Sequence, residues 1–278
     1  MPIRPNERQG GFVLVAVLWL VTLLALQISI FNLTVRDAGF LAGNELAFAR
    51  GEALTAAGVE LAAARRLEPD AAWLWLADGS TREVSFGGAR LYITISDEAG
   101  RFDINELDGE VAESLLRPFA RSEQVLKQWV ESLQGRPLLE PSELGRVLGL
   151  PSSAVQALAQ YLTVHGGDGK INAMVASRAA LLMLPGAKTV EIDRALELRR
   201  RGGESAPEVA AALGSVDQWL TSRAGPAYRV EVTVRGDGQP AIGRAEAIIL
   251  PGKDLAAPFR VLSWRSEPTV GEPEWDQR

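Results

Sequence analysis

A continuous apolar run near the start of the chain constrains its fold more than any other feature. The run extends from Phe12 to Val35 without a charged residue, and it follows Gly10-Gly11 and a short polar leader. About 24 residues make a helix of roughly 36 Å, which is enough to cross a bilayer with some tilt. A secretory signal is cut after its apolar stretch, whereas here a Gly-Phe pair lies before it. Cleavage between Gly11 and Phe12 would leave the apolar helix as the new N-terminus.

Composition and charge exclude several classes of function. The 278 residues carry a net charge of −6 with a pI near 5.1, which argues against a general binder of polyanions. Cysteine is absent and His165 is the one histidine, so disulfides, zinc sites and His-dependent triads are not expected. Arg4 and Arg8 precede the apolar run, while Arg36 after it is offset by Asp37. This bias places the leader in the cytoplasm and the rest of the chain outside.

The apolar run continues into a longer helix. No proline occurs between Pro5 and Pro69, so residues 12–67 can form one helix of roughly 80 Å. Its outer half is amphipathic and needs a domain to cover its apolar stripe. Small residues recur every four positions there, which permits close approach of another backbone. These small residues are Gly39, Gly43, Ala47 and Gly51. Two interpretations stay open for them: a groove for helix packing, or simply the alanine-rich composition of the helix.

Strand patterns occur in two groups that are more than a hundred residues apart. The first group is a hairpin in which Glu83–Phe86 and Arg90–Ser96 are joined by Gly87-Gly88, because glycines supply the positive φ of a two-residue turn. The second group starts with the alternating segment Tyr228–Arg235. One sheet interrupted by the intervening segment is the economical topology, since each half alone is short. The second group continues over Gly243–Leu250 and Phe259–Trp264.

Helical patterns fill the interval between the strand groups, roughly Asp103 to Arg223. Capping residues followed by apolar faces predict a series of short helices there. We predict an exposed loop around His165, a turn at Gly166–Lys170 that lacks the spacing of a phosphate loop, and a disordered tail from Ser266 onward. The predicted helices begin at Ser122, Pro141, Ser152, Thr189 and Ser215.

Two helix pairs in this block, Leu144–Leu158 and Leu181–Leu196, are typical of helix-hairpin-helix motifs. Nucleic-acid-binding versions use a Gly-apolar-Gly turn whose amides meet phosphate, but Pro151 and Lys188 stand where the second glycine belongs. Residues 110–223 contain thirteen basic and thirteen acidic residues, whereas phosphate binding needs a basic excess. We therefore interpret both pairs as packing hairpins and expect no nucleic acid as a partner.

An acidic segment follows the first hairpin. Its oxygen-bearing side chains could ligate a hard cation, but a solvated acidic loop is the preferred interpretation. We predict no metal, no other cofactor and no catalytic residues. The segment contributes Asp97, Glu98, Asp103, Asn105, Glu106 and Asp108.

The order of leader, glycine, phenylalanine and long apolar helix resembles a type IV prepilin or a type II secretion pseudopilin. Position five after the cleavage is Ala16. Most members carry a glutamate there, whose carboxylate is thought to pair with the terminal amine of a neighbouring subunit. The missing glutamate, the large helical insertion and Leu18-Trp19 together resemble the K-type minor pseudopilin of type II secretion.

The resemblance extends to three further segments: Asp97–Asn105, Tyr161–Ala173 and Leu184–Gly186. The chain departs from the family pattern at Ala173–Val175, where Asn-Thr-Ala is usual. It departs again at Trp129–Leu133, where the family carries an acidic stretch, and this puts any calcium site of that kind in doubt.

The resemblance implies an α+β fold, with a long pilin-like helix that is transmembrane in its first half and an antiparallel sheet domain interrupted by an inserted all-α domain of helix-hairpin-helix or SAM-like type. The boundaries expected are 1–11 for the leader, 12–35 and 36–67 for the transmembrane and periplasmic halves of the helix, 68–102 and 224–265 for the sheet domain, 103–223 for the insertion and 266–278 for the tail.

It also implies a non-enzymatic minor pseudopilin. Prepilin peptidase would cut it after Gly11 and methylate Phe12, leaving a single-pass protein of the bacterial inner membrane with a periplasmic C-terminal domain. It would cap and initiate the pseudopilus tip together with I-, J- and H-type minor pseudopilins and the major pseudopilin, and could contact secreted substrates. The alternative is a membrane-anchored helix-hairpin-helix DNA-binding protein of a DNA-uptake system.

Overall fold

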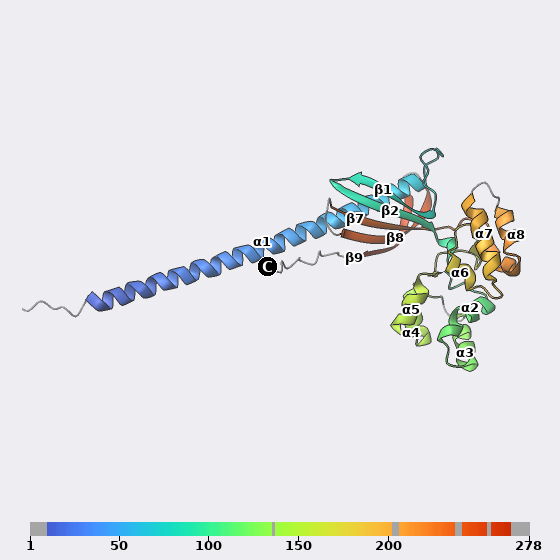
Figure 1. Ribbon diagram of the computed structural model, residues 1–278, viewed down its shortest axis with the longest axis horizontal. Helices are drawn as coiled ribbons and strands as arrows, with labels where there is room; N and C mark the ends of the chain where they lie inside the picture. The colour runs from blue at the N-terminus through green and yellow to red at the C-terminus, as the bar shows by residue number, and fades with distance from the viewer. Residues whose placement is uncertain (1–9, 135–136, 202–205, 237–240, 255–256, 268–278) are drawn as a thin grey trace, which may run out of the picture.

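The protein is an elongated molecule with one projecting helix (Figure 1). The computed structural model describes residues 10–134, 137–201, 206–236, 241–254 and 257–267. Helix α1 (Gly10–Arg66) leads into a five-stranded sheet, and the remaining helices gather at the end of the molecule opposite the start of α1 (Figure 1). The predicted α+β class, with its long N-terminal helix and antiparallel sheet, is confirmed.

Helix α1 has two environments along its length. Val13–Arg50 is exposed apart from Phe40, whose side chain is not described, and burial begins at Gly51. The hydroxyl groups in the apolar part of the helix are satisfied within the helix itself. Thr22, Ser29 and Thr34 each donate a hydrogen bond to the backbone carbonyl three or four residues earlier. Within the described residues, one helix is long and apolar enough to cross a membrane, and it is this one.

All five strands of the main sheet are antiparallel, in the order β1-β2-β7-β8-β9. The predicted hairpin and the predicted segment Tyr228–Arg235 are confirmed, and Gly87 and Gly88 have φ of 59° and 72°. The other two predicted strands are longer in the structure, and β9 includes Ser266 and Glu267, which the sequence assigns to the tail. The strands are β1 (Asp78–Phe86), β2 (Ala89–Asp97), β7 (Tyr228–Arg235), β8 (Ala241–Asp254) and β9 (Ala257–Glu267).

The last turns of α1 cover one face of this sheet. Leu54 and Val59 are buried against alternate apolar residues of β2 and β7. The closest approach is at Gly51, where an added Cβ would lie 2.3 Å from the carbonyl oxygen of Ile242, and Gly243 faces Gly51 from β8. This contact requires glycine on the helix.

We predict opposite effects of alanine at Gly51 and at Gly39 or Gly43. Gly51→Ala forces the helix away from β8 and costs about 1–3 kcal/mol, as overpacking does. No atom lies within 4 Å of a Cβ at Gly39 or Gly43, so alanine there leaves stability unchanged or raises it by about 0.4–1 kcal/mol. Thermal unfolding of the full chain in detergent measures the difference. Equal losses at all three positions would contradict the described helix–sheet contact.

The chain between β2 and β7 forms an inserted lobe with its own hydrophobic core. The predicted helix starts at Ser122, Ser152 and Thr189 agree with the structure. Ser122 caps its helix, because its hydroxyl accepts a hydrogen bond from the amide of Val125. The segment predicted as a helix from Ser215 is a short 3-10 helix, η4 (Gly214–Trp219). The helices are α2 (Gly109–Leu116), α3 (Glu123–Gln134), α4 (Leu144–Leu148), α5 (Ser152–Ala159), α6 (Arg178–Leu182), α7 (Thr189–Arg201) and α8 (Ala206–Ala212), with 3-10 turns η1 (Glu98–Gly100), η2 (Arg117–Phe119) and η3 (Pro141–Glu143).

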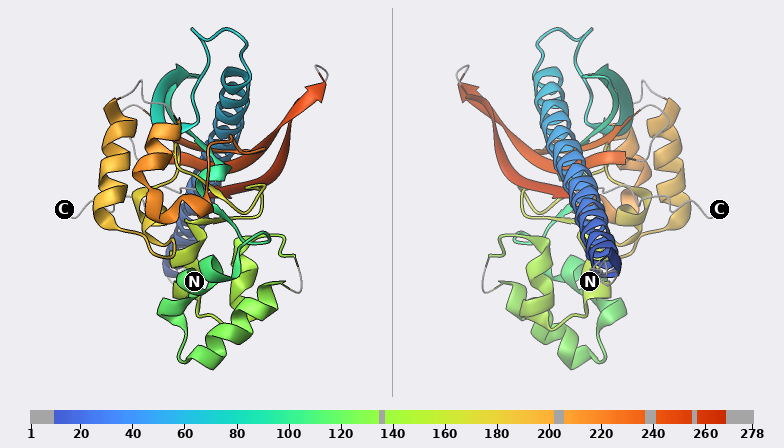
Figure 2. Two further views of the ribbon diagram at one scale, coloured as in Figure 1. Left: turned by 90° about the vertical axis from the view of Figure 1, so that its right-hand side faces the viewer. Right: turned by 90° about the vertical axis from the view of Figure 1, so that its left-hand side faces the viewer.

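Two short parallel strand pairs tie the inserted lobe together, and the sequence does not predict them. β3 (Phe102–Asp103) pairs with β4 (Leu162–Thr163), and β5 (Ile171–Asn172) pairs with β6 (Leu220–Thr221). Each strand has two residues, which is too short for an alternating pattern to be recognised. The lobe lies beside one end of the sheet (Figure 2).

Candidate functional site

The exposed half of α1 is the first candidate site. Leu41, Leu46 and Phe48 are 64%, 72% and 45% exposed in the part of the helix that precedes the sheet. Gly39, Gly43 and Ala47 are exposed in the same segment, whereas Gly51 is buried under β8. Among the described residues, the sheet therefore covers the last of these four small residues, and the first three are open to contact with another molecule.

The residues of the predicted cleavage lie at the very start of α1. Gly11 and Phe12 are helical, and Ala16 is exposed one turn further on. The preceding leader, residues 1–9, lies outside the described residues, as does the tail from 268 to 278. The structure therefore places Ala16 on an open helical surface.

The junction between the sheet and the inserted lobe is the second candidate site. It brings together two segments that the resemblance singled out, since Phe102 and Ile104 donate amide hydrogen bonds to the carbonyls of Tyr161 and Thr163 at 2.8 and 2.9 Å. The side chain of Asp103 accepts from the amides of Gly166 and Gly167 at 2.8 and 3.2 Å. Segments sixty residues apart in the sequence thus form one structural unit.

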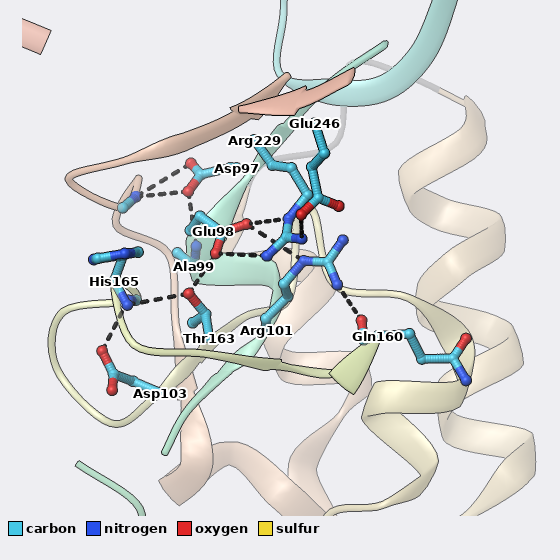
Figure 3. A network of polar contacts seen from close by, with 12 residues as sticks. Asp97, Glu98, Ala99, Arg101, Asp103, Gln160, Thr163, His165, Arg229 and Glu246 are labelled. Carbon is cyan, nitrogen blue, oxygen red and sulfur yellow. Dashed lines mark hydrogen bonds and ion pairs between the residues drawn. The ribbon is translucent and has the colours of Figure 1, made fainter. Parts of the chain in front are cut away.

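A buried ion-pair network is at the centre of this junction (Figure 3). Glu98 is fully buried, and its carboxylate accepts hydrogen bonds from Arg229 at 2.8 and 3.3 Å and from the hydroxyl of Thr163. Arg101 lies 3.4 Å from the same carboxylate. Arg229 also pairs with Glu246 on β8 at 2.7 Å. Glu98 therefore connects the inserted lobe with β7, and Arg229 extends the connection to β8.

The network shifts the acidities of its members. Burial alone would raise the pKa of Glu98, but the charge and hydrogen bonds of Arg229 outweigh it, so the pKa of this carboxyl is lowered. Burial acts in the opposite sense on Arg229, and its two carboxylate partners raise the pKa of the guanidinium. Both groups stay charged at neutral pH, as a closely paired buried ion pair requires.

The prediction of a solvated acidic loop is wrong for Asp97, Glu98 and Asp103, which are buried and whose carboxylates are used internally. It agrees with the structure at Glu106 and Asp108, which are exposed. Asp97 accepts from the amides of Ala99 and Gly225 at 2.9 and 3.0 Å. Besides nearby amides such as that of Ala99, these carboxylates bind donors that are distant in the sequence, such as Gly166 and Arg229. The pattern of acidic residues therefore could not indicate that they are buried.

The described residues contain no group of three or more His, Cys, Asp or Glu side chains that could hold a metal ion. The turn of the first helix hairpin has Gly149 at φ 68°, and that of the second has Gly186 at φ 73°. Pro151 has no N–H to offer a phosphate. The two hairpins pack into the core of the lobe through Leu144, Leu158 and Leu181.

A cleft of about 1100 Å³ separates the inserted lobe from the outer face of β8 and β9. Leu150 and Val155 line it from the lobe, and Ile248 and Leu262 line it from the sheet. His165, predicted as an exposed loop residue, is half-buried and lines this cleft. The cleft is a feature of the tertiary structure that no local sequence signal indicates.

Arg229 is the member of this candidate site that the sequence does not indicate. The alternating pattern of β7 assigns it to the solvent-facing side with Glu231 and Thr233. It is 6% exposed because the inserted lobe covers that end of the sheet. The burial of Arg229 could be inferred only from its pairing with the distant Glu98, and a single sequence does not reveal such a pairing.

No protein-family model matches the chain, and no curated protein matches it. Among solved structures, the chain is similar to one in the crystal structure of the GspK-GspI-GspJ complex from the type 2 secretion system of enterotoxigenic Escherichia coli. The TM-score is 0.54 at 11% identity, over 81% of this chain and 98% of the other. The chain therefore has a pseudopilin-like fold.

Proposed function

We propose that the protein is a minor pseudopilin of the K type, which caps and initiates the tip of a type II secretion pseudopilus. The observation that carries the proposal is the combination of a pseudopilin-like fold with a helix whose described side chains are exposed from Val13 to Arg50. The similar structure is a complex of three such proteins, so this chain would assemble with I- and J-type partners, and also with an H-type and the major pseudopilin.

The position of the inserted lobe supports a role at the tip. The lobe lies at the end of the molecule away from the start of α1 (Figure 1). Such bulk is incompatible with close repetition along a filament but is accommodated at its end. The cleft beside the lobe is a place where secreted substrates could be contacted.

The proposal includes processing and a membrane topology. Prepilin peptidase would cut between Gly11 and Phe12 and methylate Phe12. The apolar helix would then hold the protein in the bacterial inner membrane, with the C-terminal domain in the periplasm, as the arginines of the leader favour. The protein would act by assembly and not by catalysis.

Cross-linking tests the proposed helix contact directly, because the chain has no native cysteine. Ala47→Cys places a thiol on the exposed half of α1, and Asp70→Cys places a matched thiol in the exposed loop after it. We expect Ala47→Cys, paired with a cysteine on the partner's helix, to give disulfide-linked complexes with other minor pseudopilins in membranes. Cross-linking at Asp70 but not at Ala47 would overturn the proposed helix contact.

We predict that Ala16→Glu is tolerated and does not improve secretion. In most family members this glutamate pairs with the subunit above, and a subunit at the tip has none. A lone carboxylate in the bilayer costs roughly 2.5–3.5 kcal/mol on insertion scales, which a long apolar helix withstands. Secretion assays in a strain that carries only the variant measure the effect. Restoration of an otherwise defective filament by Ala16→Glu would refute the capping role.

The DNA-uptake alternative has a separate readout. DNA binding would appear as a gel shift of the full chain in detergent that weakens steeply as salt rises, because phosphate contacts release counterions. The charge-neutral helical block and the missing amide at Pro151 lead us to expect no such shift.

A further inference from the structure

The sheet and the inserted lobe are separate cores. The apolar side chains of the lobe form one cluster, which includes Phe102, Leu126 and Leu181. Those of α1 and the sheet form another, which includes Leu54 and Ile93. Two bodies without a shared hydrophobic core are free to move relative to each other unless polar contacts fix them.

The polar contacts are concentrated where the chain passes between the two bodies. The first passage contains Asp97 and Glu98, and the second contains Gly225 and Arg229. Glu98 binds Arg229 and Asp97 accepts from the amide of Gly225, so the two passages are joined by buried bonds. This side of the lobe is a fixed point.

The cleft extends away from this fixed point. Thr163 and Arg229 of the network are among the residues that line it, and its apolar walls include Val155 of α5 and Leu262 of β9. Its mouth is spanned by Glu140 and Arg265, whose charged groups are 3.4 Å apart and whose side chains are 53% and 52% exposed. A half-exposed pair at this distance is a weak contact.

We propose that the inserted lobe is hinged on the sheet, with the Glu98–Arg229 network as its pivot and the Glu140–Arg265 pair as a latch across the mouth of the cleft. When the latch is released, the lobe rotates about the pivot and the cleft widens. The apolar walls favour closure, because closing removes them from water. The cleft is thus a clamp of variable width.

The test measures a distance across the two bodies in the full chain in detergent. Spin labels at Gln128→Cys on α3 and Ser85→Cys on β1 are both at exposed sites, and the absence of native cysteine leaves the labels unambiguous. Pulsed dipolar spectroscopy is compared for the labelled parent and for Glu140→Ala and Arg265→Ala. The matched control is Arg146→Ala, which breaks the 2.9 Å pair with Glu143 inside the lobe.

We expect Glu140→Ala and Arg265→Ala to shift population toward longer distances by about 1.4- to 5-fold, which corresponds to about 0.2–1 kcal/mol for an exposed pair. The double variant should shift no further than the larger single one, and Arg146→Ala should match the parent. Raising the salt concentration should shift the distance distribution of the parent toward longer distances and should leave that of the double variant unchanged. A single unchanged distance in every variant would show a rigid lobe and overturn the proposal, as would an equal shift in Arg146→Ala.

Discussion

Replacing Gly11 by leucine should leave the leader on the chain and abolish assembly. The resemblance to prepilins places the cut after this glycine, and a branched side chain would block it. The uncut chain keeps Arg4, Glu7 and Arg8 at the end of the apolar helix. Packing these charges among apolar helices costs several kcal/mol, so the precursor stays apart from its partners.

Intact mass spectrometry and co-purification with partner pseudopilins measure both consequences. The chain offers a matched control one residue earlier, since Gly10→Leu leaves the residue before the cut unchanged and should be processed. A Gly11→Leu chain that still begins at Phe12 would show that the cut does not depend on this glycine. An uncut chain that still co-purifies with its partners would show that processing is not required for assembly.

Substitution of Glu98 by glutamine should destabilise the junction by about 3–5 kcal/mol, the usual cost of removing one partner from a buried ion pair. Glu98 is fully buried and holds Arg229 through two hydrogen bonds, so the variant leaves a buried guanidinium with only Glu246 opposite it. Denaturant unfolding of the full chain in detergent gives the difference.

The pair of half-buried Glu143 with exposed Arg146 supplies the control. Arg146→Ala should cost at most about 1 kcal/mol. The double variant Glu98→Met with Arg229→Met should lose less stability than the sum of the losses in the two single variants. Removing both charges leaves neither a Glu98 carboxylate without Arg229 nor an Arg229 guanidinium without Glu98. Strict additivity would mean that the two residues act independently.

The same network predicts a pH dependence. The pKa of Glu98 lies below its ordinary value of 4.5, so its stabilisation is complete above that pH and is lost as the pH falls through the lowered pKa. The advantage of the wild type over Glu98→Gln should therefore shrink below pH 4.5. Asp97 acts in the opposite direction because burial raises its pKa, so the comparison between the two chains isolates Glu98. A constant difference from neutral to acidic pH would contradict the lowered pKa.

Local patterns predicted much of the fold. The apolar run and the absence of proline gave α1 as one helix, and the alternation over Tyr228–Arg235 gave β7 with its bounds. The Gly87-Gly88 turn gave the β1–β2 hairpin. Each of these features depends on neighbours within a few residues, and such signals are present in a single sequence.

Long-range pairing is what the sequence did not supply. Glu98 and Arg229 are 131 residues apart, and the alternation over Tyr228–Arg235 does not indicate that Arg229 is buried. Similarly, nothing at Gly51 distinguishes it from Gly39 or Gly43, although β8 covers only Gly51. A site formed by two distant segments becomes visible only when the chain is folded.

The mature N-terminus tests the central claim most directly. In the proposed assembly, a peptidase removes the polar leader so that the apolar helix can pack beside those of its partners. Mass spectrometry of the protein purified from bacterial membranes should find a chain that begins at Phe12, with a methyl group on its amine. A purified protein that still begins at Met1 would contradict the account.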